Sequence, residues 1–115
     1  MHELSIANSI LEAVQAEAAR RGGVCVRSVG VRVGEWSGVV PEALEFGFEA
    51  LVKDTAWKSL KLQIERCPRR QRCTACGHEF AVDGYEWNCP ACNSSQTVPI
   101  SGDELEIAYL EVEGP

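Results

Sequence analysis

The sequence predicts an α+β fold: a small mixed three-stranded sheet with two helices, plus an inserted four-cysteine lobe of the zinc-ribbon type. Three patterns carry this prediction. Apolar residues recur at helical spacing in two segments, and they alternate with polar residues in three others. Between the second and third of these strands the periodicity stops and two close cysteine pairs appear. A chain of 115 residues can hold one modest core and a small lobe that metal stabilises.

The first predicted helix lies at the N-terminus. One apolar stripe with three- and four-residue spacing defines it: Leu4, Ala7, Ile10, Leu11, Val14 and Ala18. Gly22 and Gly23 should end the helix. Arg20 and Arg21 in its last turn complement the carbonyl end of the helix dipole, and Glu17 stands four residues before Arg21, at ion-pair spacing.

Three segments show the period-two alternation of strands. The alternating residues are Val29, Val31 and Val33 in the first segment, Leu60, Leu62 and Ile64 in the second, and Leu105, Ile107 and Tyr109 in the third. The first strand should end near Gly34. In the third strand Leu110 and Val112 break the phase, which indicates a β-bulge.

A second helix should begin after the first strand. Pro41 suits the first position of a helix, where a backbone N–H would have no partner anyway. Its predicted buried face is Leu44, Phe48, Leu51 and Val52, with Phe46 at the flank. A glycine in mid-helix, Gly47, costs about 1 kcal/mol, so its presence indicates either close packing at that point or a compromise that the sequence does not identify.

Two cysteine pairs indicate a structural zinc site. Cys73 and Cys76 bracket two residues, and after twelve more residues Cys89 and Cys92 repeat the spacing. Two such knuckles complete an all-thiolate tetrahedron without an open position, which is the structural and not the catalytic arrangement of zinc. Redox iron in a rubredoxin-like site is the alternative for the same four ligands.

The cysteine pairs define a second domain. We predict that residues 66–98 form a zinc-binding domain, inserted into an α/β domain made of residues 1–65 and 99–115. Gly77 lets the chain turn with positive φ after the first knuckle. A short hairpin that shields the metal should contain Phe80, Val82, Tyr85 and Trp87.

Two further cysteines stand outside the pairs. Cys25 lies between two valines at the start of a strand, and we expect it to be a small core residue, whereas Cys67 is a stray thiol or a spare ligand.

The N-terminus runs straight into a helical pattern with no secretory signal, and no apolar stretch approaches the roughly 18 to 20 residues that span a bilayer. We therefore expect a cytoplasmic protein, no membrane partner, and metal in place of disulfides.

The histidine at position 2 points to a different metal. A free α-amine, the deprotonated amide nitrogen of His2 and its imidazole Nδ1 can close two fused chelate rings in one plane. Planar nitrogen coordination favours Ni²⁺ or Cu²⁺ over Zn²⁺, which prefers a tetrahedron. A solvated terminus without any metal is the alternative reading of the same residue.

Several segments together resemble the HypA/HybF family of nickel-insertion metallochaperones. They are Met1 to Ser5, Val31 to Glu35, Val40 to Phe46 and the two cysteine knuckles, in this order. The resemblance implies nickel binding at Met1 and His2 with help from Glu3, and zinc at the four paired cysteines. It also implies delivery of nickel to the large subunit of nickel–iron hydrogenase, or also to urease, with a nickel-handling GTPase as partner. His78 is either a fourth nickel ligand or a surface histidine.

Charge and motifs weigh against other classes of function. Arginines cluster before the first knuckle, near Tyr85 and Trp87, and would suit a zinc ribbon that binds nucleic acid or an acidic protein: Arg66, Arg69, Arg70 and Arg72. Acidic residues outnumber basic ones 17 to 11, however, and a net charge of −6 repels nucleic acid. We find no nucleophile–histidine motif and no phosphate-binding loop, so no enzyme activity is predicted.

Overall fold

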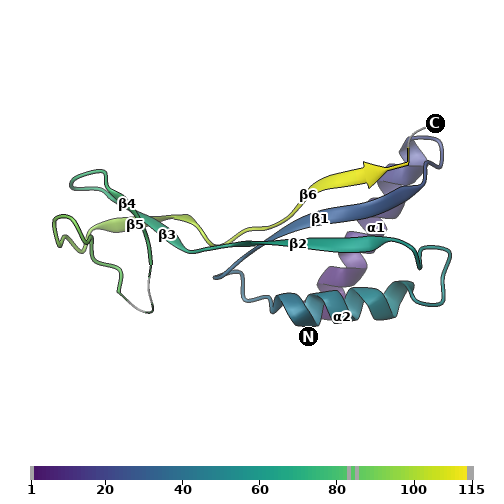
Figure 1. The fold of residues 1–115 in the computed structure, drawn as a ribbon, viewed down its shortest axis with the longest axis horizontal. Helices are drawn as coiled ribbons and strands as arrows, with labels where there is room; N and C mark the ends of the chain where they lie inside the picture. Colours follow the sequence, from purple (N-terminus) through teal and green to yellow (C-terminus); the bar gives the residue numbers. More distant parts are fainter. Residues whose placement is uncertain (1, 83, 85, 114–115) are drawn as a thin grey trace.

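The computed structural model describes residues 2–82, 84 and 86–113, with the backbone alone for His2 (Figure 1). The elements along the chain are α1 (His2–Arg20), β1 (Val26–Gly34), α2 (Pro41–Val52), β2 (Lys61–Cys67), β3 (Arg70–Cys73), β4 (Glu79–Ala81), β5 (Thr97–Ser101) and β6 (Leu105–Val112). They form two separate three-stranded sheets in an elongated molecule of 54 × 30 × 15 Å. No helix in the described part of the chain is long and apolar enough to cross a membrane.

The larger sheet is mixed, as the sequence predicts. Its strand order is β2-β1-β6, with β1 parallel to β2 and antiparallel to β6. Val29, Val31 and Val33 of the central strand are at most 2% exposed, because they face the core that α1 and α2 complete. Arg66 at the end of β2 makes an ion pair with Glu42 in the first turn of α2, so this helix runs along β2.

The two helices pack closely against each other at Gly47. A Cβ placed on this glycine would lie 3.6 Å from Cδ1 of Leu4 and 3.9 Å from Cβ of Ala7, both on α1. These are ordinary van der Waals contacts. The close packing predicted from a glycine in mid-helix is therefore confirmed, although the space still admits a methyl group.

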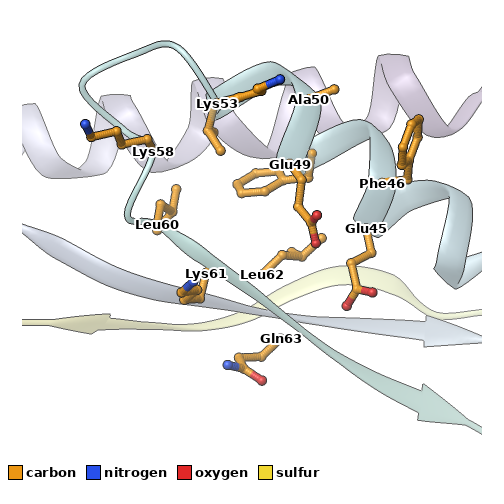
Figure 2. A pocket seen from close by; sticks show the side chains of 12 residues that line it. Glu45, Phe46, Glu49, Ala50, Lys53, Lys58, Leu60, Lys61, Leu62 and Gln63 are labelled. Carbon is orange, nitrogen blue, oxygen red and sulfur yellow. The ribbon is translucent and has the colours of Figure 1, made fainter.

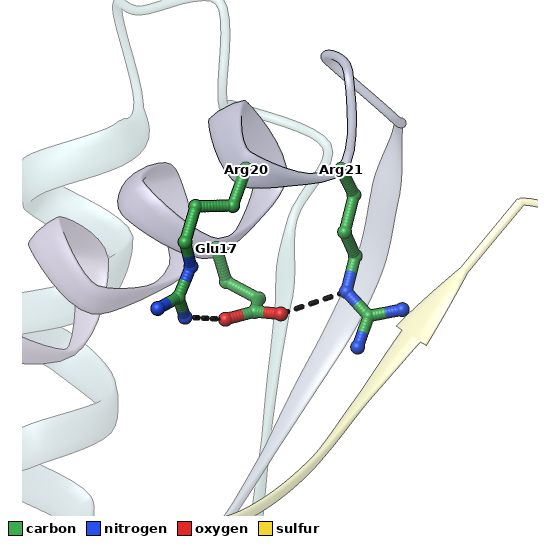
Figure 3. A network of polar contacts seen from close by, with 3 residues as sticks. All are labelled: Glu17, Arg20 and Arg21. Atoms are coloured by element: carbon green, nitrogen blue, oxygen red, sulfur yellow. Dashed lines mark hydrogen bonds and ion pairs between the residues drawn. The ribbon is translucent and has the colours of Figure 1, made fainter.

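The C-terminal end of α1 is closed as predicted. Gly22 and Gly23 both have positive φ, and the N–H of Gly23 donates a hydrogen bond of 2.8 Å to the carbonyl of Ala18. Glu17 accepts hydrogen bonds from both Arg20 and Arg21, one at each carboxylate oxygen (Figure 3). This network lies on the exposed side of the last turn.

The predicted β-bulge lies in β6. Gly30 of β1 pairs with Tyr109, whereas the next residue, Val31, pairs with Ile107, so Ala108 is the extra residue in the ladder. The bulge brings Tyr109 directly over Gly30, where a Cβ would lie 2.1 Å from a carbon of the tyrosine ring. At Gly30, the face of the sheet that points away from the helices is therefore covered by the ring of Tyr109.

The second sheet was not predicted from the sequence. Its strand order is β4-β3-β5, with both pairs antiparallel, and it lies at the opposite end of the molecule from α1 (Figure 1). Only Gln71 and Cys73 of the four residues in β3 are buried, too few for an alternation to be read. The chain passes from β2 of the larger sheet into β3 of the smaller sheet, and it returns from β5 of the smaller sheet to β6 of the larger sheet. Two connections therefore link the two sheets.

Candidate metal centre

The four paired cysteines meet at one point in the smaller lobe. Their Sγ atoms all lie within 4.8 Å of one another, with 3.5 Å between Cys73 and Cys92 and 3.6 Å between Cys76 and Cys89. Four sulfurs at about 2.3 Å around a tetrahedral Zn²⁺ stand roughly 3.8 Å apart, so the cluster fits the ion. All six cysteines of the chain are free, and no disulfide competes for these thiols.

The two knuckles have the same backbone geometry. The carbonyl of Cys73 accepts a hydrogen bond of 2.8 Å from the N–H of Gly77, and the carbonyl of Cys89 accepts one of 2.7 Å from Asn93. Gly77 has φ +80° and Asn93 has φ +64°, so each knuckle ends in a left-handed residue. The turn at Gly77 is predicted from the sequence and the turn at Asn93 is not, although asparagine is the residue after glycine that best tolerates this conformation.

One cysteine of each knuckle is buried and the other is exposed. Cys73 and Cys89 are at most 1% exposed and pack with Phe80 and Val82, whereas Cys76 and Cys92 face solvent. Of the four residues predicted to shield the metal, Phe80 and Val82 pack against these buried cysteines. The hairpin differs from the prediction, because β4 pairs with β3, which precedes the first knuckle. Tyr85 lies outside the described residues.

The thiols of the cluster differ in acidity. Burial opposes ionisation of Cys73, but hydrogen bonds from the N–H groups of Cys76 and Ala75 and from neighbouring thiols outweigh it and lower its pKa to about 6. The N–H of Ser94 lowers the pKa of Cys92, yet the hydrogen bonds among the thiols, first with Cys73, together with partial desolvation prevail and raise it to about 12. Cys73 therefore ionises before Cys92, and a bound cation must displace the proton of Cys92.

A stack of three side chains joins the metal lobe to the larger sheet. The guanidinium carbon of Arg69 lies 3.6 Å from the ring centroid of Trp36 and 4.9 Å from that of Trp87. The two rings are 4.8 Å apart and tilted by 54°. Arg69 also donates from its backbone N–H to Glu35 and from Nη1 to the carbonyl of Gly84, at 2.5 and 3.1 Å. Trp36 follows β1 and Trp87 precedes the second knuckle, so the stack spans both lobes.

Backbone groups also meet beside this stack, where β1 ends and the connection from β5 to β6 passes. The N–H of Trp36 donates to the carbonyl of Gly102 at 2.5 Å, and the N–H of Glu35 donates to the carbonyl of Cys67 at 3.0 Å. A Cβ on Gly34 would lie 2.1 Å from the carbonyl oxygen of Gly102, which is a clash with backbone. Gly34 therefore ends β1 because the chain after β5 crosses directly over it.

The predicted nickel ligands lie at the start of α1. Met1 and the imidazole of His2 lie outside the described residues. The carboxylate of Glu3 accepts a hydrogen bond of 3.1 Å from the N–H of Val40, the residue that precedes α2. This bond is the main cause that lowers the pKa of Glu3. Glu3 thus ties the beginning of α1 to the beginning of α2.

The remaining candidate residues are not in the four-thiol cluster. Cys67 is buried between the lobes, and burial raises the pKa of its thiol. Cys25 is exposed, so the prediction of a core residue is wrong: β1 begins only at Val26, and the alternation does not extend back to the cysteine. His78 is exposed and stacks on Phe80 with 6.1 Å between ring centroids.

The arginines before the first knuckle do not form one basic surface. Arg66 makes an ion pair with Glu42, and Arg69 lies between the two tryptophans. Arg70 and Arg72 lie on β3, where Arg70 is half-buried and Arg72 is exposed. The arrangement gives no continuous track for a phosphate backbone.

Comparison with known proteins gives one consistent family. Residues 1–112 match the family model described as "Hydrogenase/urease nickel incorporation, metallochaperone, hypA". The hydrogenase maturation factor HypA of Geobacter metallireducens is 47% identical over 113 residues, 98% of this chain and 100% of the relative. That of Chlorobium luteolum is 40% identical over 113 residues, 98% of this chain and 97% of the relative.

Two solved structures have the same fold. A solution structure of a HypA protein superimposes with a TM-score of 0.73 at 23% identity and covers 98% of this chain and 97% of its own. The solution structure of the nickel metallochaperone HypA from Helicobacter pylori gives a TM-score of 0.63 at 22% identity and covers 96% of each chain. At these identities the likeness concerns the α+β fold alone.

Proposed function

The chain belongs to the HypA family of nickel-incorporation metallochaperones, and from this premise we propose which residues hold its metals and meet its partners. The protein is a nickel metallochaperone in the maturation of nickel–iron hydrogenase, and the family description also names urease. It carries metal and catalyses no reaction. The observation that carries the proposal is the convergence of four thiols in one lobe of a chain whose residues 1–112 match the family model.

We propose that the four-thiol cluster holds a structural Zn²⁺ and that residues 66–98 form a zinc domain. Four thiolate donors suit a soft, tetrahedral ion, and the small apolar cluster around Phe80 is too small to fold the lobe without it. We expect about one zinc per chain in protein purified without chelator, with four sulfurs at about 2.3 Å by X-ray absorption. Two or more nitrogen or oxygen ligands on that zinc, or a red protein that contains iron, would overturn this assignment.

We propose that nickel binds at Met1, His2 and Glu3, within an α/β domain of residues 1–65 and 99–115. Helix α1 begins at His2, and a backbone N–H in the first turn of a helix has no acceptor within the helix. That amide can lose its proton to the metal without breaking a helical hydrogen bond. The positive end of the helix dipole opposes a cation here, and the carboxylate of Glu3 in the same turn offsets this repulsion.

The test separates the two metals. His2→Ala should abolish stoichiometric nickel binding in isothermal titration and prevent hydrogenase maturation, while zinc content and fold stay unchanged. A tag left on the N-terminus should have nearly the same effect, because it removes the free amine without touching the imidazole. If His2→Ala still binds one nickel per chain with unchanged affinity, the terminal site is wrong, and His78 and Cys67 become the ligands to examine.

We propose a nickel-handling GTPase and the hydrogenase large subunit as partners, in the cytoplasm. A closed four-thiolate site requires reduced cysteines, which the cytosol maintains. The GTPase should dock on the exposed side of α1. Glu12→Arg is the sharper variant for this test, because Glu12 is exposed, whereas Glu17 is engaged by Arg20 and Arg21. If only substitutions in the zinc lobe weaken binding, the docking surface lies at the other end.

A further inference from the structure

A groove runs along the larger sheet where α1 passes β6, and we call it the α1–β6 groove. Two hollows of about 300 and 410 Å³ form it, and they meet at Ile107 of β6, which lines both. On the helix side, small residues at intervals of four leave the space open: Ser5, Ser9 and Ala13. The groove ends at Arg20 and Arg21, both of which are bound by Glu17.

The groove leaves the apolar face of β6 uncovered. Leu105 and Ile107 pair with two core valines of β1, which are at most 2% exposed, so all four lie on the core-facing side of the sheet. Leu105 and Ile107 are nevertheless 42% and 38% exposed. The apolar face of the sheet thus continues past the part that the helices cover, and such a surface is typical of a binding site for another chain.

Strand β6 is also an open edge of the sheet. It stands last in the strand order β2-β1-β6, so within the described residues no strand pairs with its outer side. An edge strand presents backbone N–H and C=O groups that can pair with a further strand. Lysine and proline, which commonly protect such edges, are absent from residues 105–112, and the bulge at Ala108 divides the edge into two short stretches. An extended segment of a partner can therefore add to the sheet here.

The charge along β6 is negative. Residues 103–113 contain five acidic residues and no basic one: Asp103, Glu104, Glu106, Glu111 and Glu113. Arg32 of β1 lies opposite Glu106, but its Nε donates to Glu65 on the far strand at 3.2 Å. Glu111 accepts a hydrogen bond of 2.8 Å from the hydroxyl of Ser28, a neutral donor that does not balance its charge. A segment that approaches β6 therefore meets negative charge on the face away from the helices.

The opposite edge of the larger sheet lacks this pattern. A groove of about 780 Å³ lies there between α2 and β2, and its lining carries both signs of charge (Figure 2). The charged residues that line it are Glu45, Glu49, Lys53, Lys58 and Lys61. Mixed charge selects neither a basic nor an acidic segment. The α2–β2 groove therefore provides a control surface on the same sheet.

We propose that the α1–β6 groove binds an extended basic segment of a partner protein, which adds to β6 as a further strand of the larger sheet. Side chains alternate between the two faces of a strand. Those on the inner face of the segment are apolar and fill the groove beside Leu105 and Ile107. Those on the outer face are lysine or arginine and lie next to Glu106 and Glu111. The segment is thus recognised by its alternation as well as by its charge.

Synthetic peptides test this recognition with the zinc-loaded chain and without nickel, so the result is independent of the terminal metal site. The probe is a fluorescent peptide of about eight residues, a typical strand length, in which valine and lysine alternate. By fluorescence anisotropy it should bind at least about tenfold more tightly than a peptide in which valine and glutamate alternate. It should also bind about fivefold more tightly than a peptide of the same composition with its valines and lysines in two blocks.

Substitutions locate the site on the chain. Glu106→Lys places a like charge beside the bound segment and should raise the dissociation constant of the alternating peptide by about tenfold. Glu45→Lys changes the net charge of the chain by the same amount in the α2–β2 groove, and it should change the dissociation constant by less than about twofold. Ile107→Thr keeps a β-branched residue on the strand but makes the groove polar, and it should weaken binding about fivefold. Hydrogen exchange of the β6 amides should slow when the peptide binds, while that of the β2 amides stays unchanged.

Four results would overturn the proposal. The first is an alternating peptide that does not bind. The second is equal binding of the block peptide, because charge alone would then suffice and no strand would form. The third is weaker binding to Glu45→Lys but not to Glu106→Lys, which would place the peptide in the α2–β2 groove. The fourth is faster exchange of the β6 amides on dilution of the chain alone, because a second copy would then cover this edge.

Discussion

Replacement of Arg69 by alanine should loosen the joint between the lobes more than it weakens either lobe. The guanidinium lies over two indole rings, and its Nε and Nη2 atoms are buried without a hydrogen-bond partner in the described residues, so the rings are what they face. A partly desolvated cation–π contact is worth about 1 to 2 kcal/mol. The hydrogen bond from Nη1 to Gly84 adds about 1 kcal/mol. Arg69→Ala should therefore cost about 2 to 3 kcal/mol, a large part of a typical domain's stability.

Tryptophan fluorescence reports this joint directly. Trp36 and Trp87 form the stack, whereas Trp57 packs against the main core and contributes a constant background that Trp57→Phe removes. In the Trp57→Phe background, Arg69→Ala should change the emission of the zinc-loaded protein and lower its urea midpoint. Arg69→Lys keeps the charge but loses the planar group, and should recover only part of the loss. Arg72→Ala, at an exposed arginine on β3, should stay within about 0.5 kcal/mol of the parent.

An unchanged emission spectrum and an unchanged midpoint in Arg69→Ala would refute this reasoning. The backbone contacts around Gly102 would then suffice to hold the lobes. A fall in zinc content on Arg69→Ala would also contradict it, because the stack lies outside the thiol cluster and should not affect its stoichiometry.

Three further predictions concern glycines, acidity and the second knuckle. Gly47→Ala should raise the free energy of unfolding by about 0.5 to 1 kcal/mol, because the added methyl group has room. Gly34→Ala should lower the free energy of unfolding by more than about 2 kcal/mol, because its methyl group would clash with the backbone of Gly102. Denaturant titration of both variants measures these changes. The folded lobe lowers the pKa of Cys73 to about 6, so its thiolate favours the folded, zinc-binding lobe fully above the pKa of a free thiol, about 8.5, and this contribution is lost as pH falls through about 6. Zinc affinity measured by chelator competition should therefore fall across this range. Asn93→Gly should keep the zinc affinity, and Asn93→Val should reduce it in chelator competition, because a β-branched residue resists φ +64°.

The sequence predicts what local patterns determine and misses what distant segments create. The helices, the larger sheet and the four-thiol cluster follow from periodicity and spacing, which are properties of neighbouring residues. The stack of Trp36, Arg69 and Trp87 joins three places in the chain, and no periodicity marks such a contact. The prediction that Cys25 is a core residue failed for a local reason. Its two valine neighbours are apolar, but apolar neighbours do not determine at which residue the strand starts. Asn93 was overlooked because its left-handed backbone is visible only in the folded knuckle.

The alternation of buried and exposed thiols in the cluster sets an order for the exchange of a bound ion. Cys76 and Cys92 face solvent, one from each knuckle, while Cys73 and Cys89 lie beneath them. A chelator or an alkylating reagent can therefore reach only the outer pair at first. An ion that has lost one outer thiolate is still held by the two inner ones, and it can be recaptured before it leaves. The site should thus release its metal slowly and in steps, even though half of its ligands are open to water.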